Sequence, residues 1–397
     1  MDSPRPPRRR SRAASAVPIP QTREIHEAAL QSIRTFLKGR SSYDVFPVSF
    51  RLIVLDNKLE AKKALQALMA NGVVSAPLWN SETSRFAGMF TVSDIIHLIQ
   101  YYYHSASSYD NATADVQHFR LESLREIERE LNVPPPPLIS IHPLKPLFDA
   151  CKLLIQSTAR RLPLLDYDEK TGDEIVISVL TQYRVLKFIA INCREATHLH
   201  RSLRSLGIGT WVDANSPNPN NPFHPICTAT LETTVFDVVH MFSERGISAV
   251  PVVDENGIVV NLYETVDVIT LVRLGHYRSL DFTISSALNQ RAPDFPGVIT
   301  CSPSDSLASL LLLIKERRVH RLVVVDGEEG RRGRLLGIIT LSDVLQYVIG
   351  DIDSAPPPSS SLPTTGAASL AVPQAGKPGL SDPERVEPPF AGGFSPS

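Results

Sequence analysis

The sequence contains no apolar run that could cross a membrane. Its most apolar stretch, Leu307 to Ile314, is far shorter than the roughly 20 residues that a spanning helix needs. Residues 1–20 also lack the apolar core of a secretory signal. These two absences exclude a membrane protein and argue against secretion.

Cysteine is scarce, and its spacing follows no known pattern. The four cysteines show no CxxC spacing, which argues against a disulfide framework or a zinc site. They are Cys151, Cys193, Cys227 and Cys301. Three of them lie in apolar surroundings and are interpreted as core thiols, so we expect a reducing compartment.

The motifs of common catalytic sites are also missing. The chain has no GxGxxG after a strand, no phosphate-binding P-loop and no Gly-x-Ser-x-Gly turn. His320-Arg321 is followed by Leu322, which excludes the catalytic loop of a protein kinase. His198 and His200 have no carboxylate or thiol nearby to complete a metal site. A net charge of −2 argues against a general nucleic-acid binder.

The sequence does contain a distinctive stretch at residues 317–347. An apolar, strand-like run, Leu322 to Val325, is followed by a charged turn and by a second β-branched run, Gly337 to Thr340. Ser342 and Asp343 then open an apolar-periodic helix, since Ser or Asp before such a run is a helix start signal. The stretch therefore predicts a strand, a turn, a strand and a helix.

This arrangement predicts an anion site at the start of the helix. Exposed amides and the positive end of the helix dipole favour a negative group there. His320 and Arg321 stand at the beginning of the first strand, close to the same point. One acid and two bases around one cleft suit a nucleotide, with Asp343 for ribose hydroxyls and the bases for phosphates.

The same order of strand, turn, strand, polar step and helix occurs four times. The first strands carry equivalent residues at Pro77, Pro163, Pro251 and Val323. Each repeat also has an amphipathic helix upstream: Lys58 to Ala70, Leu147 to Ser157, Val235 to Glu244 and Ser306 to Arg317. A unit of this length buries little core alone, so we expect the units to pair. The alternative is four unrelated strand–helix units in an ordinary α/β domain.

Composition divides the chain into nine segments. The four repeats are expected at 41–104, 138–196, 224–279 and 280–350, and an amphipathic helix at 23–40. The connecting segments are a linker helix at 105–137 and a linker and loop at 197–223. The two ends are a basic, Pro-rich arm at 1–22 and a Pro- and Ser-rich tail at 351–397, both expected to be disordered.

Two of these segments have open interpretations. The N-terminal arm carries an arginine cluster at 8–10 and 12, which fits a disordered arm, a nuclear-import signal or a kinase target at Ser11 or Ser15. The helix at 23–40 covers either a partner or its own domain, and we favour a partner-facing role. For the whole chain we expect the cytoplasm and the nucleus.

The repeat resembles the cystathionine-β-synthase (CBS) domain. The motifs that carry this resemblance are SAPLW at 75–79, ISVLTQYRVLKF at 177–188, ISAVPVVD at 247–254, VHRLVVVD at 319–326 and TLSD at 340–343. The span from about 40 to 350 is similar to the γ regulatory subunit of AMP-activated protein kinase, and especially to its fungal form. The resemblance implies an α+β/α/β fold of four CBS repeats in two tandem pairs (Bateman modules) that form a flattened disk.

The resemblance also implies up to four nucleotide clefts, each with an acid at the helix start that binds ribose. The matching acids are Asp94, Asp267 and Asp343, whereas the second repeat has Arg184, so we expect that cleft to be empty. The phosphate-facing positions match at Arg161, His320 and Arg321, with Arg160 where the family has histidine. The wall of the Asp267 cleft matches at Thr210, Ser248 and Ala249. Small hydroxyls near the other two acids match at Thr91, Ser93, Thr340 and Ser342.

Departures from the family pattern suggest an order in which the three clefts should bind nucleotide. Val74 stands where the mammalian family has a phosphate-binding arginine, and Tyr183 replaces a lysine. We therefore expect the Asp267 cleft to be the best site, the Asp343 cleft the second and the Asp94 cleft the third.

The resemblance implies a non-catalytic regulatory subunit that senses energy or glucose status. AMP, ADP and ATP would be its ligands, with no catalytic cofactor or metal, and a catalytic α kinase chain and a β scaffold chain its partners. An enzyme tied to nucleotide metabolism would need a catalytic domain for which the repeats leave no room. The remaining alternative is a CBS scaffold whose clefts bind no nucleotide.

Overall fold

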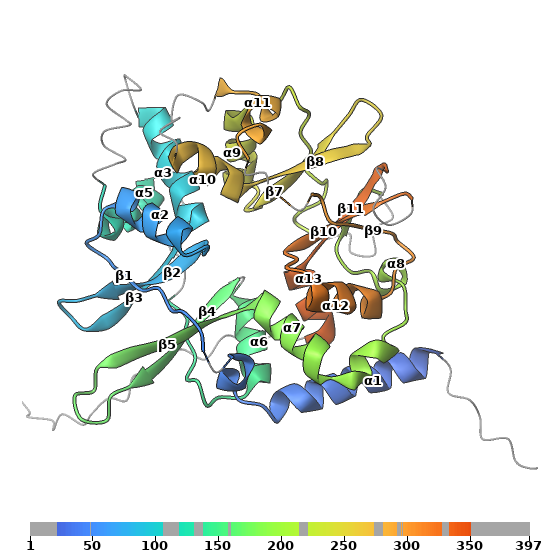
Figure 1. Ribbon diagram of the computed structural model, residues 1–397, viewed down its shortest axis with the longest axis horizontal. Helices are drawn as coiled ribbons and strands as arrows, with labels where there is room; N and C mark the ends of the chain where they lie inside the picture. Colours follow the sequence, from blue (N-terminus) through green and yellow to red (C-terminus); the bar gives the residue numbers. More distant parts are fainter. Residues whose placement is uncertain are drawn as a thin grey trace, which may run out of the picture. The chain divides into compact units, whose positions relative to one another are not determined.

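The computed structural model describes residues 22–47, 49–105, 119–130, 138–157, 160–213, 221–273, 281–291, 295, 297–327 and 333–350. This part consists of four copies of one unit, a helix, a β-hairpin and a second helix (Figure 1). The basic arm, except for Thr22, and the Pro- and Ser-rich tail lie outside the described residues. Within the described part, no helix has the length and hydropathy that crossing a membrane requires.

The four hairpins are antiparallel and share one register. They are β2 (Ser75–Asn80) with β3 (Arg85–Thr91), β4 (Arg161–Tyr167) with β5 (Glu174–Thr181), β7 (Ala249–Val253) with β8 (Val259–Glu264), and β10 (Arg321–Val325) with β11 (Leu335–Thr340). Each has a register shift one residue after the equivalent of Pro77: at Leu78/Trp79, Leu164/Leu165, Val252/Val253 and Val324/Val325. A bulge at the same place in every hairpin confirms that the four segments are one repeated unit.

Two helices flank each hairpin. The upstream helices are α2 (Ala61–Ala70), α6 (Leu147–Gln156), α9 (Val235–Glu244) and α12 (Leu307–Glu316), close to the predicted ranges. The downstream helices are α3 (Val92–Ser105), α7 (Gln182–Asn192), α10 (Thr265–Arg273) and α13 (Leu341–Ile349). Each downstream helix begins directly after the second strand, and for α7 and α13 the side chain of the last strand residue, Thr181 or Thr340, caps the helix.

Short segments complete the units. The strands β1 (Leu55–Asp56) and β9 (Thr300–Cys301) run parallel to β2 and β10, and β6 (Thr210–Trp211) pairs antiparallel with β11. The connecting segments contain short 3-10 helices and α-helices: η1 (Ser42–Val45), η2 (Leu121–Ser123), α5 (Leu124–Glu130), η3 (Arg194–His198), α8 (Leu203–Leu206) and α11 (Ile284–Leu288). Isolated bridges such as Glu60 to Arg120 and Thr234 to Thr283 hold η2 and α11 beside the upstream helices of repeats 1 and 3.

The hairpins pair neighbouring repeats. Between repeats 1 and 2, the backbone N–H of Phe86 in β3 donates to Glu174 Oε2 in β5 at 2.7 Å. Between repeats 3 and 4, Ile258 and Arg334 form an antiparallel bridge, and a small core joins Ala249 and Val325. The expected tandem pairs are therefore confirmed.

The helices pair repeats in the other combination. One core joins the helices of repeats 1 and 3, where α3 contacts α9 and α10. A second core joins repeats 2 and 4, where α7 contacts α12 and α13. Each repeat thus packs its sheet against one repeat and its helices against another, which buries the apolar surface that a single unit would expose.

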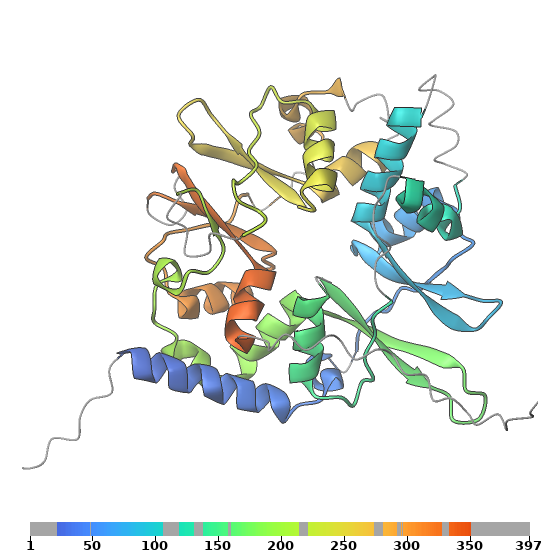
Figure 2. The ribbon, with the colours of Figure 1, turned by 180° about the vertical axis from the view of Figure 1, so that it is seen from behind.

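The N-terminal helix α1 (Thr22–Lys38) belongs to the second core. It lies beside α6, α13 and η3 (Figures 1 and 2), with Leu30, Ile33 and Leu37 buried. Arg34 Nε donates to the carbonyl of Val348 at 2.8 Å, near the end of α13. The apolar face of α1 therefore covers its own chain, whereas a partner-facing role for its exposed side, which includes Ile25, stays a prediction.

Candidate functional site

The four downstream helices start with the same arrangement. The residue before each helix is Thr91, Thr181, Glu264 or Thr340, and the third helical residue is Asp94, Arg184, Asp267 or Asp343. Sequence reasoning took Ser342 and Asp343 as the helix start signal. In the structure they lie within the first turn of α13, and Thr340 is the N-cap with a capping box to Asp343. The acid therefore bonds to the backbone of its own cap.

Asp343 has one carboxylate oxygen without a partner among the described residues. Its Oδ2 accepts from the backbone N–H and the hydroxyl of Thr340, both at 2.7 Å. Within the described part of the chain, its Oδ1 accepts no hydrogen bond and no guanidinium pairs with it. Burial raises the pKa of Asp343, while the Thr340 bonds oppose that rise. Ser342, beside it, donates to Gln182 Oε1 on α7 at 3.0 Å.

Asp267 is held by an arginine of its own chain. Arg291 binds it through two nitrogens, with Nε to Oδ1 at 2.8 Å and Nη2 to Oδ2 at 2.5 Å. The backbone N–H of Glu264 also donates to Oδ2 at 2.8 Å. Ser248 and Ala249 lie at this helix start, since the carbonyl of Ser248 accepts from the backbone of Thr265. Both oxygens of Asp267 are therefore engaged.

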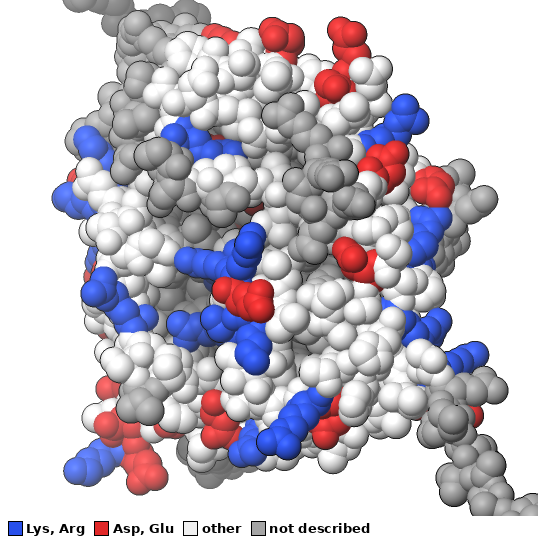
Figure 3. Space-filling view, turned by 45° about the vertical axis from the view of Figure 1, so that its right-hand side comes forward, with Lys and Arg blue, Asp and Glu red and all other residues white. Residues whose placement is uncertain are grey.

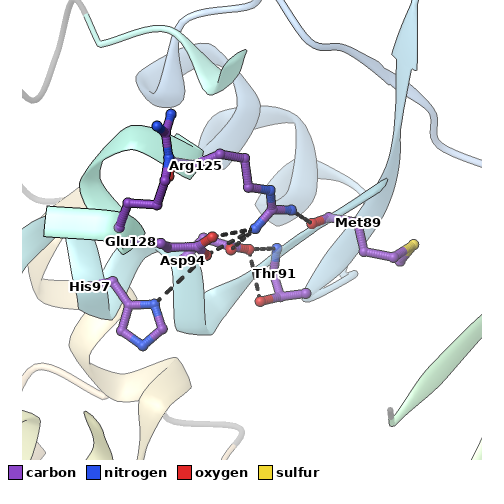
Figure 4. Close-up of polar contacts among 7 residues, drawn as sticks. Met89, Thr91, Asp94, His97, Arg125 and Glu128 are labelled. Atoms are coloured by element: carbon purple, nitrogen blue, oxygen red, sulfur yellow. Dashed lines mark hydrogen bonds and ion pairs between the residues drawn. The ribbon is translucent and has the colours of Figure 1, made fainter. Parts of the chain in front are cut away.

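Asp94 is covered by the linker helix α5. Its side chain faces Thr91 and Arg125, and Arg125 in turn binds Glu128 (Figure 4). Arg125 Nη1 lies 3.7 Å from Asp94 Oδ1 and 2.7 Å from Glu128 Oε2. His97 Nδ1 lies 3.9 Å from Glu128 Oε1. Only 4% of the surface of Asp94 is exposed, so this acid is closed off, whereas the predicted neighbour Ser93 is exposed.

The environment of Asp94 changes its titration. Burial raises the pKa of Asp94 to about 6, although Arg125 and the backbone bond from Thr91 oppose the rise. Burial also disfavours the charge of Glu128, but His97 and Arg125 outweigh it and lower the pKa of that carboxyl. Of the two acids, Glu128 is therefore the one that keeps its charge as the pH falls.

Thr210 lies on a short strand that joins the fourth repeat. β6 pairs with β11, so that Thr210 stands opposite Ile338, and its predicted place in the wall of the Asp267 cleft stays a prediction. Its hydroxyl accepts from Asn221 Nδ2 at 2.8 Å. Thr210 is therefore part of the fourth repeat's sheet, two residues along β11 from Thr340. The reason is that the segment between repeats 2 and 3 adds a strand to the repeat 4 hairpin.

Basic residues of repeats 2 and 4 gather together. Burial and neighbouring charges lower the pKa of Arg161 to about 10, with Arg160 and Arg318 as the neighbours. Burial also lowers the pKa of His320 to about 4, with help from Arg318, Arg321 and Arg161. We call this group the cation cluster, in which the arginines carry the charge and His320 is neutral near pH 7: Arg160, Arg161, Arg184, Arg318, His320 and Arg321.

Within the described residues, only one member of the cation cluster pairs with a carboxylate. Arg321 Nε lies 3.2 Å from Glu264 Oε1, on the neighbouring repeat. Arg184, in place of the acid of repeat 2, lies over the Phe46 ring at 5.0 Å instead. Figure 3 shows a face of the molecule where Lys and Arg side chains gather beside acidic ones at a hollow. Uncompensated positive charge of this kind attracts anions.

Sequence reasoning missed four of these residues. Arg125 and Arg291 come from segments between repeats, where no motif marks them. Glu264 replaces the threonine cap of the other repeats, and Arg318 lies two residues before His320. Comparing the four repeats at the cap position would have singled out Glu264, and strand-like alternation with His320 would have drawn attention to Arg318.

Comparisons with known proteins agree with this architecture. The CBS domain model matches residues 222–273 and 294–350. The "5'-AMP-activated protein kinase subunit gamma" of Kluyveromyces lactis is 46% identical over 331 residues, 83% of this chain and 95% of that protein. The subunit of the same name from Saccharomyces cerevisiae is 45% identical over 323 residues, 81% of this chain and 94% of that protein.

A solved structure shares the fold. A crystal structure of an archaeal protein from Methanocaldococcus jannaschii superimposes with a TM-score of 0.59 at 17% identity, over 78% of this chain and 99% of that one. That likeness concerns the fold alone, whereas the identity and coverage of the two yeast proteins extend along all four repeats. The chain therefore belongs to the family of AMP-activated protein kinase γ subunits.

Proposed function

We propose that the chain is the non-catalytic, adenine-nucleotide-sensing γ subunit of a heterotrimeric serine/threonine protein kinase. Its partners would be a catalytic α chain and a β scaffold chain. Family membership supports the regulatory role. The observation that carries nucleotide binding is Asp343, a carboxylate at the start of α13 with an acceptor oxygen that no described residue occupies.

The contacts favour the Asp343 cleft for the first nucleotide. A ribose diol needs carboxylate oxygens that can accept its hydroxyl groups, and Asp343 Oδ1 meets that need. Asp267 is paired with Arg291, and Asp94 is buried beneath α5. This order differs from the one expected from the sequence, because the competing arginines come from segments between the repeats. Arg184 in the second repeat cannot accept a hydrogen bond at all.

The phosphate end would distinguish AMP, ADP and ATP. The three nucleotides share adenosine, so the ribose acid binds them alike, and a ligand that binds two states equally shifts neither. The cation cluster faces different amounts of charge with one, two or three phosphates. The coupling free energy between nucleotide binding and the state of the kinase chain would then be about 1–3 kcal/mol, the usual range for two allosteric sites.

Calorimetric titration of the purified full chain with each nucleotide tests this proposal. We expect Asp343→Asn to weaken AMP binding in its cleft about tenfold or more, which corresponds to roughly 1.4 kcal/mol. Asp237→Asn is the matched control, because Asp237 occupies the same third helical position in α9 and accepts a bond from its own cap, Thr234, outside the clefts. Unchanged AMP affinity in Asp343→Asn would refute the assignment.

The alternative is a CBS scaffold whose clefts bind no nucleotide. Two contacts favour it, since Arg291 engages one acid and α5 covers another. Dialysis of the chain against AMP, followed by a count of bound nucleotide, separates the two. A chain that retains none of the three nucleotides supports the scaffold, whereas one or more bound per chain supports the sensor.

A further inference from the structure

The acid of the third repeat is already bound to a cation that the chain itself provides. Arg291 makes two bonds to Asp267, a third to Asn261 Oδ1 at 3.1 Å and a fourth to the carbonyl of Leu262 at 2.8 Å. The exposed fractions of the two side chains are 11% for Arg291 and 15% for Asp267. A two-point guanidinium–carboxylate contact with little water around it is among the strongest ion pairs in proteins.

Arg291 reaches the cleft from the segment that joins repeats 3 and 4. Its backbone N–H donates to the carbonyl of Leu288 at the end of α11. The start of α11 is fixed next to α9, since Val235 and Phe282 are hydrogen-bonded through their backbones. The guanidinium of Arg291 lies 3.9 Å from the centre of the Phe295 ring. The chain on both sides of Arg291 therefore helps to direct it to Asp267.

The pair occupies the groups that a ribose would need. Oδ1 of Asp267 accepts from Arg291, and Oδ2 accepts from both Arg291 and the Glu264 backbone. Behind the pair, the hydroxyl of Tyr263 is buried and has no partner in the described part of the chain. The surroundings therefore supply little other compensation, and a buried carboxylate without a cation is costly. Arg291 provides that cation when no ligand is present.

The same cleft has a second internal pair. Arg321, from the start of β10, lies 3.2 Å from Glu264, the residue before α10. In the other three repeats this position is a threonine, which cannot pair with a cation. Two carboxylates and two guanidiniums thus form two ion pairs here, of which only Arg291–Asp267 is hydrogen-bonded among the described residues. By contrast, no guanidinium pairs with Asp343 among the described residues.

We propose that Arg291 is an internal occupant of the third cleft, which a nucleotide must displace to bind Asp267. This inference rests on the proposed nucleotide function. Displacement moves a residue of the segment between repeats 3 and 4, so occupancy of this cleft changes that connection. Arg291 is then a residue that sets the affinity of one cleft, and its competition lowers that affinity by the fraction of time that it is bound to Asp267.

The test is an AMP titration of the full chain by calorimetry, with Arg291 exchanged in steps. We expect Arg291→Gln to strengthen binding in the third cleft about tenfold or more, or to add one site per chain. Arg291→Lys keeps the charge but loses the two-point contact, so its gain should be smaller. Adding Asp267→Asn to Arg291→Gln should abolish the gain. Arg245→Gln is the control, because among the described residues the Arg245 side chain bonds only to the carbonyls of His224 and Pro225.

Thermal unfolding shows whether Arg291→Gln is folded and how much AMP stabilises it. Arg291→Gln leaves Asp267 without its cation, so we expect a lower melting temperature without AMP and a larger rise on adding AMP than in the wild type. Equal or weaker AMP binding in a folded Arg291→Gln chain would overturn the inference. That result would leave the proposed function intact as long as the wild type binds AMP and Asp343→Asn weakens it. If the wild type and every variant fail to bind AMP, both the inference and the proposed function fail.

Discussion

The three helix-start acids differ in their neighbours and hardly at all in their own position. Each bonds to the residue that caps its helix, so local geometry is the same. What differs is the cation: Arg125 at 3.7 Å from Asp94, Arg291 bound at two points to Asp267, and none at Asp343 among the described residues. At the residue scale, the function of each acid is therefore set by what the rest of the chain brings to it.

Asp94 should make stability depend on pH. Burial raises its pKa from 3.8 to about 6, so between these values the folded chain holds a proton that the unfolded chain has released. The stability that the folded chain gains from protonated Asp94 is therefore fully present below about pH 4 and is lost as the pH rises through about 6. We expect Asp94→Asn, which cannot ionise, to gain on the order of 1–3 kcal/mol relative to the wild type between about pH 4 and pH 7.

Urea unfolding at several pH values measures this difference. Glu128 has a lowered pKa, so its contribution to stability is lost as the pH falls. Because Glu128 is present in both the wild type and Asp94→Asn, this loss occurs in both chains. Asp237→Asn, an exposed acid at an equivalent helix position, should show no such trend. A constant difference between Asp94→Asn and the wild type from pH 4 to pH 7 would show that Asp94 ionises normally.

At the scale of elements, α1 is a structural helix of the second core. Ile33 is fully buried between α1 and the helices that it contacts, and His26 Nε2 lies 2.9 Å from the hydroxyl of Tyr347 on α13. The helix thus fastens the last helix of repeat 4 to the N-terminal part of the chain. A partner can use only its exposed residues, such as Glu24, Glu27 and Gln31.

Ile33→Ala tests this role of α1. Removing a fully buried isoleucine side chain should lower the free energy of unfolding by about 2–5 kcal/mol, because a cavity remains in the core. Gln31→Ala, on the exposed face of the same helix, should change it by less than about 0.5 kcal/mol. Chemical unfolding of both variants gives the two values. An Ile33→Ala chain of wild-type stability would instead indicate that the helix packs mainly against a partner.

At the scale of the whole described molecule, two repeats that are far apart in sequence combine their cations. Arg161 begins the first strand of repeat 2, Arg321 begins the equivalent strand of repeat 4, and Arg318 and His320 lie just before it. The helices of these repeats pack together, which brings both strand starts into one electrostatic group. The proposed phosphate-binding group therefore draws on two repeats.

Arg318→Gln should weaken ATP binding more than AMP binding. ATP carries more negative charge, so the loss of one cation costs it more, and we expect about a 3–10-fold loss for ATP and less for AMP at low salt. Lys315→Gln, three residues away on α12, removes the same charge outside the cation cluster. Calorimetry at two salt concentrations measures both. Equal losses for ATP and AMP would argue that Arg318 does not meet the phosphates.

Much of the fold was readable from local patterns. The strand runs, the turn residues and the amphipathic helices predicted four units, because each depends on neighbours close in the sequence. The same patterns located Asp343 at a helix start with His320 and Arg321 nearby, and placed Asp94 and Asp267 at the equivalent step of their repeats. Arg161 came from the resemblance to the family. The patterns did not show that Thr210 joins the fourth repeat's sheet or that the apolar face of α1 packs on its own chain, because both depend on which distant surface a segment joins.

The sequence by itself determined the repeated unit, the positions of its acids and the family. Only the tertiary structure decided which helices pair, that Thr210 extends the fourth sheet, and that Arg125 and Arg291 meet two of the acids. The physical reason is range: capping and periodicity act within a few residues, whereas an ion pair such as Arg291–Asp267 depends on how the chain between the two residues is packed.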